Sequence, residues 1–159
     1  MPIHEKPEVA LDALDWKILR ALSGNARMTI TELADVAGLS KTPCTARLKR
    51  LEAAGVILGY RVQLDPVKLG MNLIAFVEVK LSDTRAKALD EFNLSVSELP
   101  EVEQCHMIAG SFDYLLKVRT ADIVSYRRLL GEQLSALPHV AQTSTFVAME
   151  AIKDTALLE

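Results

Sequence analysis

The sequence of 159 residues has few of the residues that build disulfide frameworks, metal sites or aromatic platforms. Its two cysteines, Cys44 and Cys105, lie far apart within apolar patterns, so we expect buried thiols, with a disulfide as the alternative. The three histidines are scattered and give no metal-ligand spacing, so neither a metal nor a cofactor is expected. The single tryptophan, Trp16, is expected to pack against the protein itself rather than to bind a ligand.

Long apolar runs and an N-terminal signal are also missing. No stretch approaches the roughly 20 apolar residues that a membrane-spanning helix needs, and no apolar signal core opens the chain. We therefore expect a cytoplasmic protein without a membrane partner. With 50% hydrophobic and 25% charged residues, the composition is that of a folded protein, long enough for one ordinary domain or two small ones.

Positive charge is scarce overall, since the net charge is −3, but it is unevenly distributed. Residues 1–62 hold nine Lys/Arg against seven Asp/Glu, a net +2, and residues 63–159 hold nine against fourteen, a net −5. A basic first half joined to an acidic second half fits contact with double-stranded DNA through the first half alone. One such module neutralises few phosphates, so we expect useful affinity to require at least a dimer.

Residues 31–54 have the pattern of two short helices joined by a tight turn. Small side chains at Ala34 and Ala37 allow two helix backbones to approach closely. Gly38 can take the positive φ of a sharp helix exit, and Ser40 can cap the next helix. This spacing is typical of a helix-turn-helix, whose second helix enters the DNA major groove.

The second helix of this pair separates an apolar stripe from a polar, basic face. The inward positions are Cys44, Leu48 and Leu51. Thr42, Thr45, Ala46 and Lys49 are expected to face base edges, while Lys41, Arg47, Arg50 and Arg61 approach phosphates. Arg47 lies beside the inward stripe, so a bridge between helices is its alternative role. For the whole segment, the alternative is an ordinary helical hairpin with solvated charges.

The periodicity predicts an α+β chain with two domains. Helices are expected at 13–23, 30–37 and 41–54 within a DNA-binding domain at 11–55, after a loose tail at 1–10. A hinge strand at 56–62 continues as a linker to residue 70. Residues 71–153 then predict strands at 71–82, 102–108, 113–119 and 142–152, helices at 84–98 and 122–136, and a tail at 154–159. The order βαββαβ is that of a ferredoxin-like domain.

Two helices can cover only one face of such a sheet, yet both faces are apolar. Alternation places Ile74, Phe76, Leu115, Phe146, Ala148 and Ile152 on the second face. Packing against the same face of a second subunit would cover it and produce a two-fold dimer. The alternative, a tail at 153–159 folded over this face, is too short and polar.

Several motifs, spread over both halves, resemble those of one family. They are Leu-Asp-x-x-Asp at 11–15, Gly-Leu-Ser-x-Thr-Pro-Cys at 38–44, Arg-Leu-Lys-Arg-Leu-Glu at 47–52, Ile-Leu-Gly-Tyr at 57–60 and Cys-His-Met-Ile-Ala-Gly-Ser-Phe-Asp-Tyr at 105–114. With them, residues 11–152 resemble the Lrp/AsnC family, the feast/famine transcription regulators. The resemblance implies a winged helix-turn-helix, a hinge, a ligand-sensing domain, homodimers that assemble to octamers, and a place on the nucleoid.

The resemblance also implies a small amino acid effector, with leucine and proline as candidates, bound near the turn from Gly110 to Asp113. Gly110 would bring backbone N–H groups to the α-carboxylate, and Asp113 would meet the α-ammonium. Ser111, between them in this turn, belongs to the same expected site. Met107 and Phe146 are expected as apolar walls. The alternative is that Gly110 and Asp113 only shape a tight turn.

Two other functions compete with an amino-acid-responsive regulator. An enzyme has little support, because the sequence places no nucleophile beside a base and has no glycine-rich phosphate cradle. An architectural protein that wraps DNA without sensing a ligand would use the same two domains.

Overall fold

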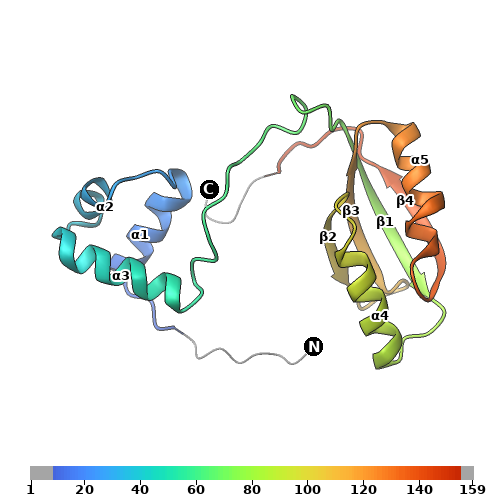
Figure 1. Cartoon of the computed structure of the whole chain (residues 1–159), viewed down its shortest axis with the longest axis horizontal. Coiled ribbons are helices and arrows are strands. Elements are labelled where there is room, and N and C mark those ends of the chain that lie inside the picture. Colours follow the sequence, from blue (N-terminus) through green and yellow to red (C-terminus); the bar gives the residue numbers. More distant parts are fainter. Residues whose placement is uncertain (1–8, 155–159) are drawn as a thin grey trace. The chain divides into compact units, whose positions relative to one another are not determined.

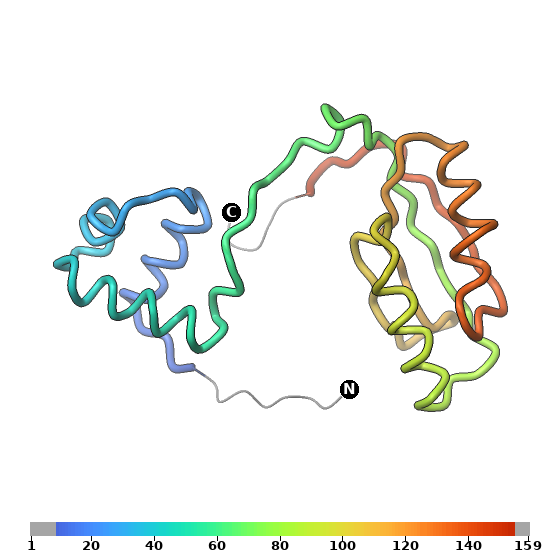
Figure 2. Tube along the Cα trace, in the orientation of Figure 1, coloured from blue at the N-terminus to red at the C-terminus, as the bar shows by residue number. Residues whose placement is uncertain are grey.

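A computed structural model describes residues 9–154, and the expected tails at 1–10 and 154–159 lie almost entirely outside them. The chain divides into two compact units (Figures 1 and 2). The main segment of the N-terminal unit ends at Gln63, and the C-terminal unit spans Leu64–Ile152. Each unit has a hydrophobic core of its own.

Three helices form the N-terminal unit: α1 (Ala13–Gly24), α2 (Ile30–Ala37) and α3 (Lys41–Ala53). They match the predicted bounds to within a residue. The first two helices begin with capping boxes, at Asp12 for α1 and at Thr29 for α2. In each box the side chain of the N-cap residue accepts from the backbone N–H of the third helical residue, whose own side chain accepts from the N-cap backbone N–H. The unit closes around Ile18, Leu33, Ala34, Ala37, Cys44 and Leu51, all at most 2% exposed.

The turn between α2 and α3 has the geometry that its glycine predicts. Gly38 lies in the left-handed region at φ 73°, and the N–H of Leu39 donates to the carbonyl of Ala34 at 2.9 Å. Ser40 occupies the N-cap position of α3, but its side chain makes no capping hydrogen bond, so that part of the expectation is wrong. The turn is therefore held by backbone contacts rather than by the Ser40 hydroxyl.

The hinge strand expected at 56–62 is absent from the described structure. The N–H of Ile57 still donates to the carbonyl of Leu51, and the Tyr60 hydroxyl donates to Glu52 at 2.8 Å. Residues 58–72 contain no strand, only extended chain and a turn at 66–70. A strand requires a hydrogen-bonded neighbour, and no other described segment of this chain pairs with these residues.

The C-terminal unit is a four-stranded antiparallel sheet with two helices on one face (Figure 1). Its elements are β1 (Leu73–Leu81), α4 (Ala86–Ser97), β2 (Val102–Met107), β3 (Tyr114–Thr120), α5 (Ile123–Glu132), the 3-10 turn η1 (Leu134–Ala136) and β4 (Val140–Val147). The strand order β2-β3-β1-β4 confirms the predicted βαββαβ arrangement. We call the face away from α4 and α5 the open face.

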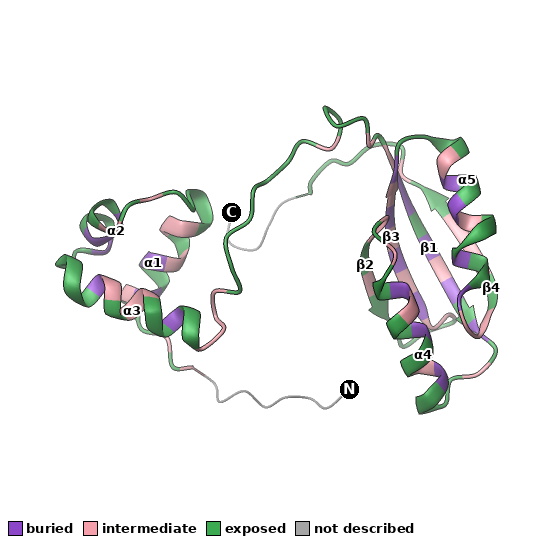
Figure 3. Cartoon of the chain, viewed as in Figure 1, coloured by how far each residue is buried: buried purple, intermediate pink, exposed green. Residues whose placement is uncertain are grey.

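Alternation along β1 and β3 builds the core between the sheet and the helices (Figure 3). Ala75, Val77 and Val79 are at most 1% exposed, and the ring of Phe92 from α4 packs on Tyr114 with centroids 4.5 Å apart. The register of β2 on β3 shifts between Val102 and Gln104. This irregularity reverses the face on which the later residues of β2 lie.

Some expected positions differ from the structure. The helical spacing of apolar residues over 122–136 predicts that Ile123 faces inward, but it is the first residue of α5 and is 55% exposed. The last strand starts two residues early and ends at Val147. The N–H of Ala148 still donates to the carbonyl of Ile74 in β1 at 2.9 Å, whereas Ile152 lies beyond the sheet. Ile152 is 85% exposed and is not part of the open face.

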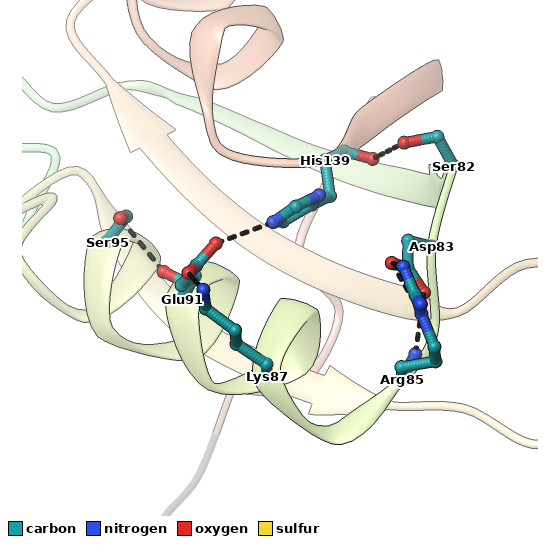
Figure 4. A network of polar contacts seen from close by, with 7 residues as sticks. All are labelled: Ser82, Asp83, Arg85, Lys87, Glu91, Ser95 and His139. Atoms are coloured by element: carbon teal, nitrogen blue, oxygen red, sulfur yellow. Dashed lines mark hydrogen bonds and ion pairs between the residues drawn. The ribbon is translucent and has the colours of Figure 1, made fainter.

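A polar cluster joins the start of β4 to the segment between β1 and α4 (Figure 4). The Nε2 of His139 lies 2.7 Å from Glu91, and the backbone N–H of Ser82 donates to the His139 carbonyl at 2.8 Å. His139 has a φ of 63°, a conformation uncommon for a residue other than glycine. Arg85 pairs with Asp83 beside this cluster. These contacts fix the corner where β4 enters the sheet.

Candidate functional site

The outward face of α3 presents short and basic side chains to solvent. Lys41, Thr42, Ala46 and Lys49 are exposed, as predicted for residues that approach base edges and phosphates. Thr45 is half-buried, and its hydroxyl donates to the Lys41 carbonyl at 2.8 Å, which leaves its oxygen free only to accept. Arg61 is exposed on the extended segment after α3.

Arg47 and Arg50 point toward α1 instead of lying free on this face. Arg47 donates from Nη1 to Asp12 at 2.7 Å and to Asp15 at 2.8 Å, and Arg50 also binds Asp15. The alternative considered for Arg47, a bridge between helices, is therefore present. The local sequence does not predict the pairing of Arg50, because its partner lies 35 residues away.

Asp15 is the buried centre of this arrangement, with a side chain that is 0% exposed. Burial alone would raise the pKa of its carboxyl. The backbone N–H of Asp12 and the guanidinium groups of Arg50 and Arg47 outweigh burial and lower the pKa of Asp15 to about 2. The carboxylate is therefore ionised at neutral pH and holds two arginines of α3 against α1.

A hollow of about 340 Å³ opens beside this cluster on the surface of the N-terminal unit. It is lined by Asp12, Pro43, Ala46, Arg47 and Arg50. Ala46 belongs to the exposed face of α3, so the hollow adjoins the surface expected to meet DNA.

In the C-terminal unit, Asp113 fastens the turn before β3 to the end of β1. Its carboxylate accepts from the N–H of Leu81 at 2.7 Å, and its own N–H donates to the carbonyl of Val79 at 2.9 Å. Its carbonyl accepts from Ile108 at 2.8 Å. The turn-shaping alternative is thus present in the structure, and one carboxylate oxygen already has a partner.

The turn at 109–112 borders a hollow of about 200 Å³ on the open face. Of the predicted effector residues, only Ser111 lines this hollow; its other lining residues are Glu78, Lys80, Phe112, Gln142 and Ser144. Gly110 lacks a positive φ, and a Cβ there would lie 3.5 Å from the side chain of Ile108. The fold of one chain therefore does not itself require glycine at this position.

Sequence reasoning missed Glu78 and Lys80 as lining residues, although a signal was available. The alternation that assigns Phe76 to the open face assigns these two residues to the same face.

The two predicted apolar walls do not meet within one chain. Met107 pairs with Tyr114, whose side chain is buried toward the helices, so Met107 shares that face at the β2 edge. Phe146 pairs with Phe76 on the open face of β4, at the opposite edge. The irregularity before Gln104 is the physical reason, because simple alternation from Val102 places Met107 on the other face.

The open face carries an apolar patch beside a charged one. Phe76 and Phe146 are adjacent and are 37% and 55% exposed. Across β2 and β3, Glu103 pairs with Lys117 at 3.3 Å and with Arg119. Both aromatic residues therefore lie where the predicted dimer would bury them.

Among residues 9–154, no group of three His, Cys, Asp or Glu side chains could hold a metal ion. None of the described helices is long and apolar enough to cross a membrane.

Comparison with known proteins identifies both units. Residues 11–57 match the family model of a winged helix-turn-helix DNA-binding domain, and residues 74–158 match that of the Lrp/AsnC ligand binding domain. The chain is 61% identical over 147 residues to a proline dehydrogenase transcriptional activator of Rhizobium radiobacter, covering 92% of this chain and 94% of that one. It is 45% identical over 156 residues to the leucine-responsive regulatory protein of Haemophilus influenzae, covering 98% and 94%.

A solved structure supports the same assignment. The transcriptional regulator NMB0573 of Neisseria meningitidis, solved as a complex with L-Met, is 34% identical and superposes with a TM-score of 0.86 over 92% of this chain and 94% of that one. With a helix-turn-helix in front of an amino acid ligand-binding domain, the chain belongs to the Lrp/AsnC family of DNA-binding transcriptional regulators.

Proposed function

We propose that this regulator reads DNA with the exposed face of α3 and adjusts its DNA binding or assembly when an amino acid binds near the turn at 110–113. The observation that carries the DNA half is the exposure of Lys41, Thr42, Ala46 and Lys49 on α3, the helix that follows the Gly38 turn. A helix that projects such residues from its first turns can insert them into the major groove. Thr45 contributes as an acceptor, and Lys41 approaches phosphate.

The effector site is proposed at the end of the sheet where Ser111 and Asp113 lie. In one chain the hollow at Ser111 is small and polar, with Glu78 and Lys80 in its lining. A second subunit is proposed to complete the site, because Met107 and Phe146 of one chain lie on opposite edges of the sheet. Asp113 keeps one oxygen for the α-ammonium while the other accepts from Leu81.

Proline and leucine are the proposed effectors. The relative with 61% identity is named as a proline dehydrogenase activator, and the relative with 45% identity as leucine-responsive. Methionine is a third ligand to include, because the Neisseria meningitidis regulator was solved with L-Met.

A DNA-binding titration on the region upstream of the protein's own gene tests this proposal. Fluorescence anisotropy is measured with a specific and a random duplex, each with and without proline, leucine and methionine. We expect specific binding that an amino acid shifts. Specific binding that no amino acid shifts supports the architectural alternative, and an absence of DNA binding contradicts the proposal.

A further inference from the structure

We propose that Asp12 is an internal competitor for DNA: it holds Arg47 in the free protein, and a DNA phosphate takes its place when α3 binds. Asp15 stays in place and positions both arginines. This inference rests on the proposed DNA contact of α3 and concerns how strongly that helix binds phosphate.

The two carboxylates differ in how firmly they are held. Asp15 is fully buried, with Oδ1 on Arg47 and Oδ2 on Arg50 and on the N–H of Asp12. Asp12 is 52% exposed, and its contact with Arg47 runs through Oδ2 alone. A buried, fully paired carboxylate is costly to uncouple, whereas an exposed ion pair contributes little to stability. The Asp12 contact is therefore the one that a phosphate can replace.

The surroundings of Arg47 suit a phosphate. Its side chain is 25% exposed and that of Arg50 is 48% exposed, and both line the hollow of about 340 Å³ that also includes Ala46. A phosphate that approaches the α3 face at Ala46 meets two guanidinium groups. Arginine can form two parallel hydrogen bonds to a phosphate. The present contact of Arg47 with Asp12 is a single hydrogen bond from Nη1 to Oδ2.

The competitor also sets the charge that DNA meets. Residues 41–50 contain four cations, and the ion pairs with Asp12 and Asp15 offset two of them in the free protein. After the exchange, Asp12 remains beside the incoming phosphate and repels it. Removal of this charge should therefore strengthen binding to any sequence, specific or random, by about the same factor.

The variant Asp12→Asn isolates the charge, because asparagine serves as an N-cap as well as aspartate does. Asp12 Oδ1 accepts from the N–H groups of Leu14 and Asp15, and the amide oxygen of asparagine can replace it. The variant Asp35→Asn is the matched control: it makes the same change in net charge on an exposed position of α2, where the described structure has no ion pair. Circular dichroism confirms folding, and Asp12→Ser provides a second neutral cap.

Affinity for a random duplex is measured in the full-length protein by anisotropy over a range of salt concentrations. We expect Asp12→Asn to bind about two- to fivefold more tightly at about 0.1 M salt, the range that an exposed ion pair allows, and Asp35→Asn to change affinity less. The gain in affinity from Asp12→Asn should vanish when it is measured in the Arg47→Gln background, between the single variant Arg47→Gln and the double variant with Asp12→Asn.

Three results would overturn the inference: no gain from Asp12→Asn, an equal gain from Asp35→Asn, or a gain that persists with Arg47→Gln. If the unmodified protein does not bind the random duplex, or the specific duplex used to test the proposed function, it is the proposed DNA contact that fails, so the two failures are distinguishable.

Discussion

Asp113 has a structural task and a proposed ligand task, and a pair of substitutions separates them. Alanine removes the acceptor for the N–H of Leu81, which is part-buried, so Asp113→Ala should lower the free energy of unfolding by about 1–3 kcal/mol. Asparagine keeps an acceptor but loses the charge for an α-ammonium. Asp113→Asn should therefore unfold close to the unmodified protein in urea and yet show no heat on titration with proline, leucine or methionine. Unchanged ligand affinity in Asp113→Asn would exclude the carboxylate as a ligand.

Asp15 makes the stability of the N-terminal unit depend on pH in the acid range. Its pKa of about 2 in the folded protein lies below the ordinary value of 3.8. The ionised carboxylate therefore contributes its full stabilisation at pH values above 3.8. The contribution is lost as pH falls from about 4 toward 2, because the unfolded chain then binds the proton more tightly. Urea unfolding at pH 6, 4 and 2.5 should show a steeper loss of stability for the unmodified protein than for Asp15→Asn. Parallel losses would mean that another group is responsible.

At the scale of single residues, the sequence predicted kinds of contact better than partners. The sequence predicts that Arg47 either contacts phosphate or bridges helices, because it borders the inward stripe of α3. The partner of Arg50, Asp15, lies 35 residues earlier, and the partner of Asp113, Leu81, lies 32 residues earlier. Local periodicity carries no information about residues so far apart in the sequence. Both pairings could therefore be identified only from the folded structure.

At the scale of elements, the first turns of α2 and α3 should respond differently to loss of a hydroxyl. Thr29 accepts from the N–H of Glu32, and Glu32 accepts from the N–H of Thr29, which closes a capping box. Ser40 makes no such bond. Thr29→Ala should therefore destabilise the protein by about 1 kcal/mol, and Ser40→Ala should cost much less. Thermal unfolding of both variants measures the difference, and equal costs would show that the Ser40 hydroxyl caps α3 in solution.

Hydrophobic periodicity was sufficient for most elements and insufficient where a neighbour decides the structure. Alternation along β1 and helical spacing along α3 place the buried residues correctly. The side-chain face of β2 depends on the shift between Val102 and Gln104, which no pattern of apolar residues reveals. Residues 56–62 have the composition of a strand, but without a pairing segment they form none in the described chain.

At the scale of the whole molecule, the open face should hold two subunits together. Phe76→Asp or Phe146→Asp would bury an unpaired carboxylate in a dimer, at a cost of several kcal/mol. Sedimentation velocity should then show monomer or aggregate. Leu94→Asp is a suitable control, because this residue is apolar and 66% exposed but lies on α4, away from the open face. A folded dimer that survives Phe76→Asp would contradict this arrangement.

The separation of the two cores has a consequence for how such a protein evolves. Each core draws its residues from one unit only, and the extended segment at 58–64 contributes to neither. A substitution that loosens one core therefore leaves the packing of the other intact, since distant sites act independently. The preference for a DNA sequence and the preference for a ligand can therefore change at different rates in evolution. Recombination within the extended segment can join a different DNA-binding domain to this ligand-binding domain without disrupting either hydrophobic core.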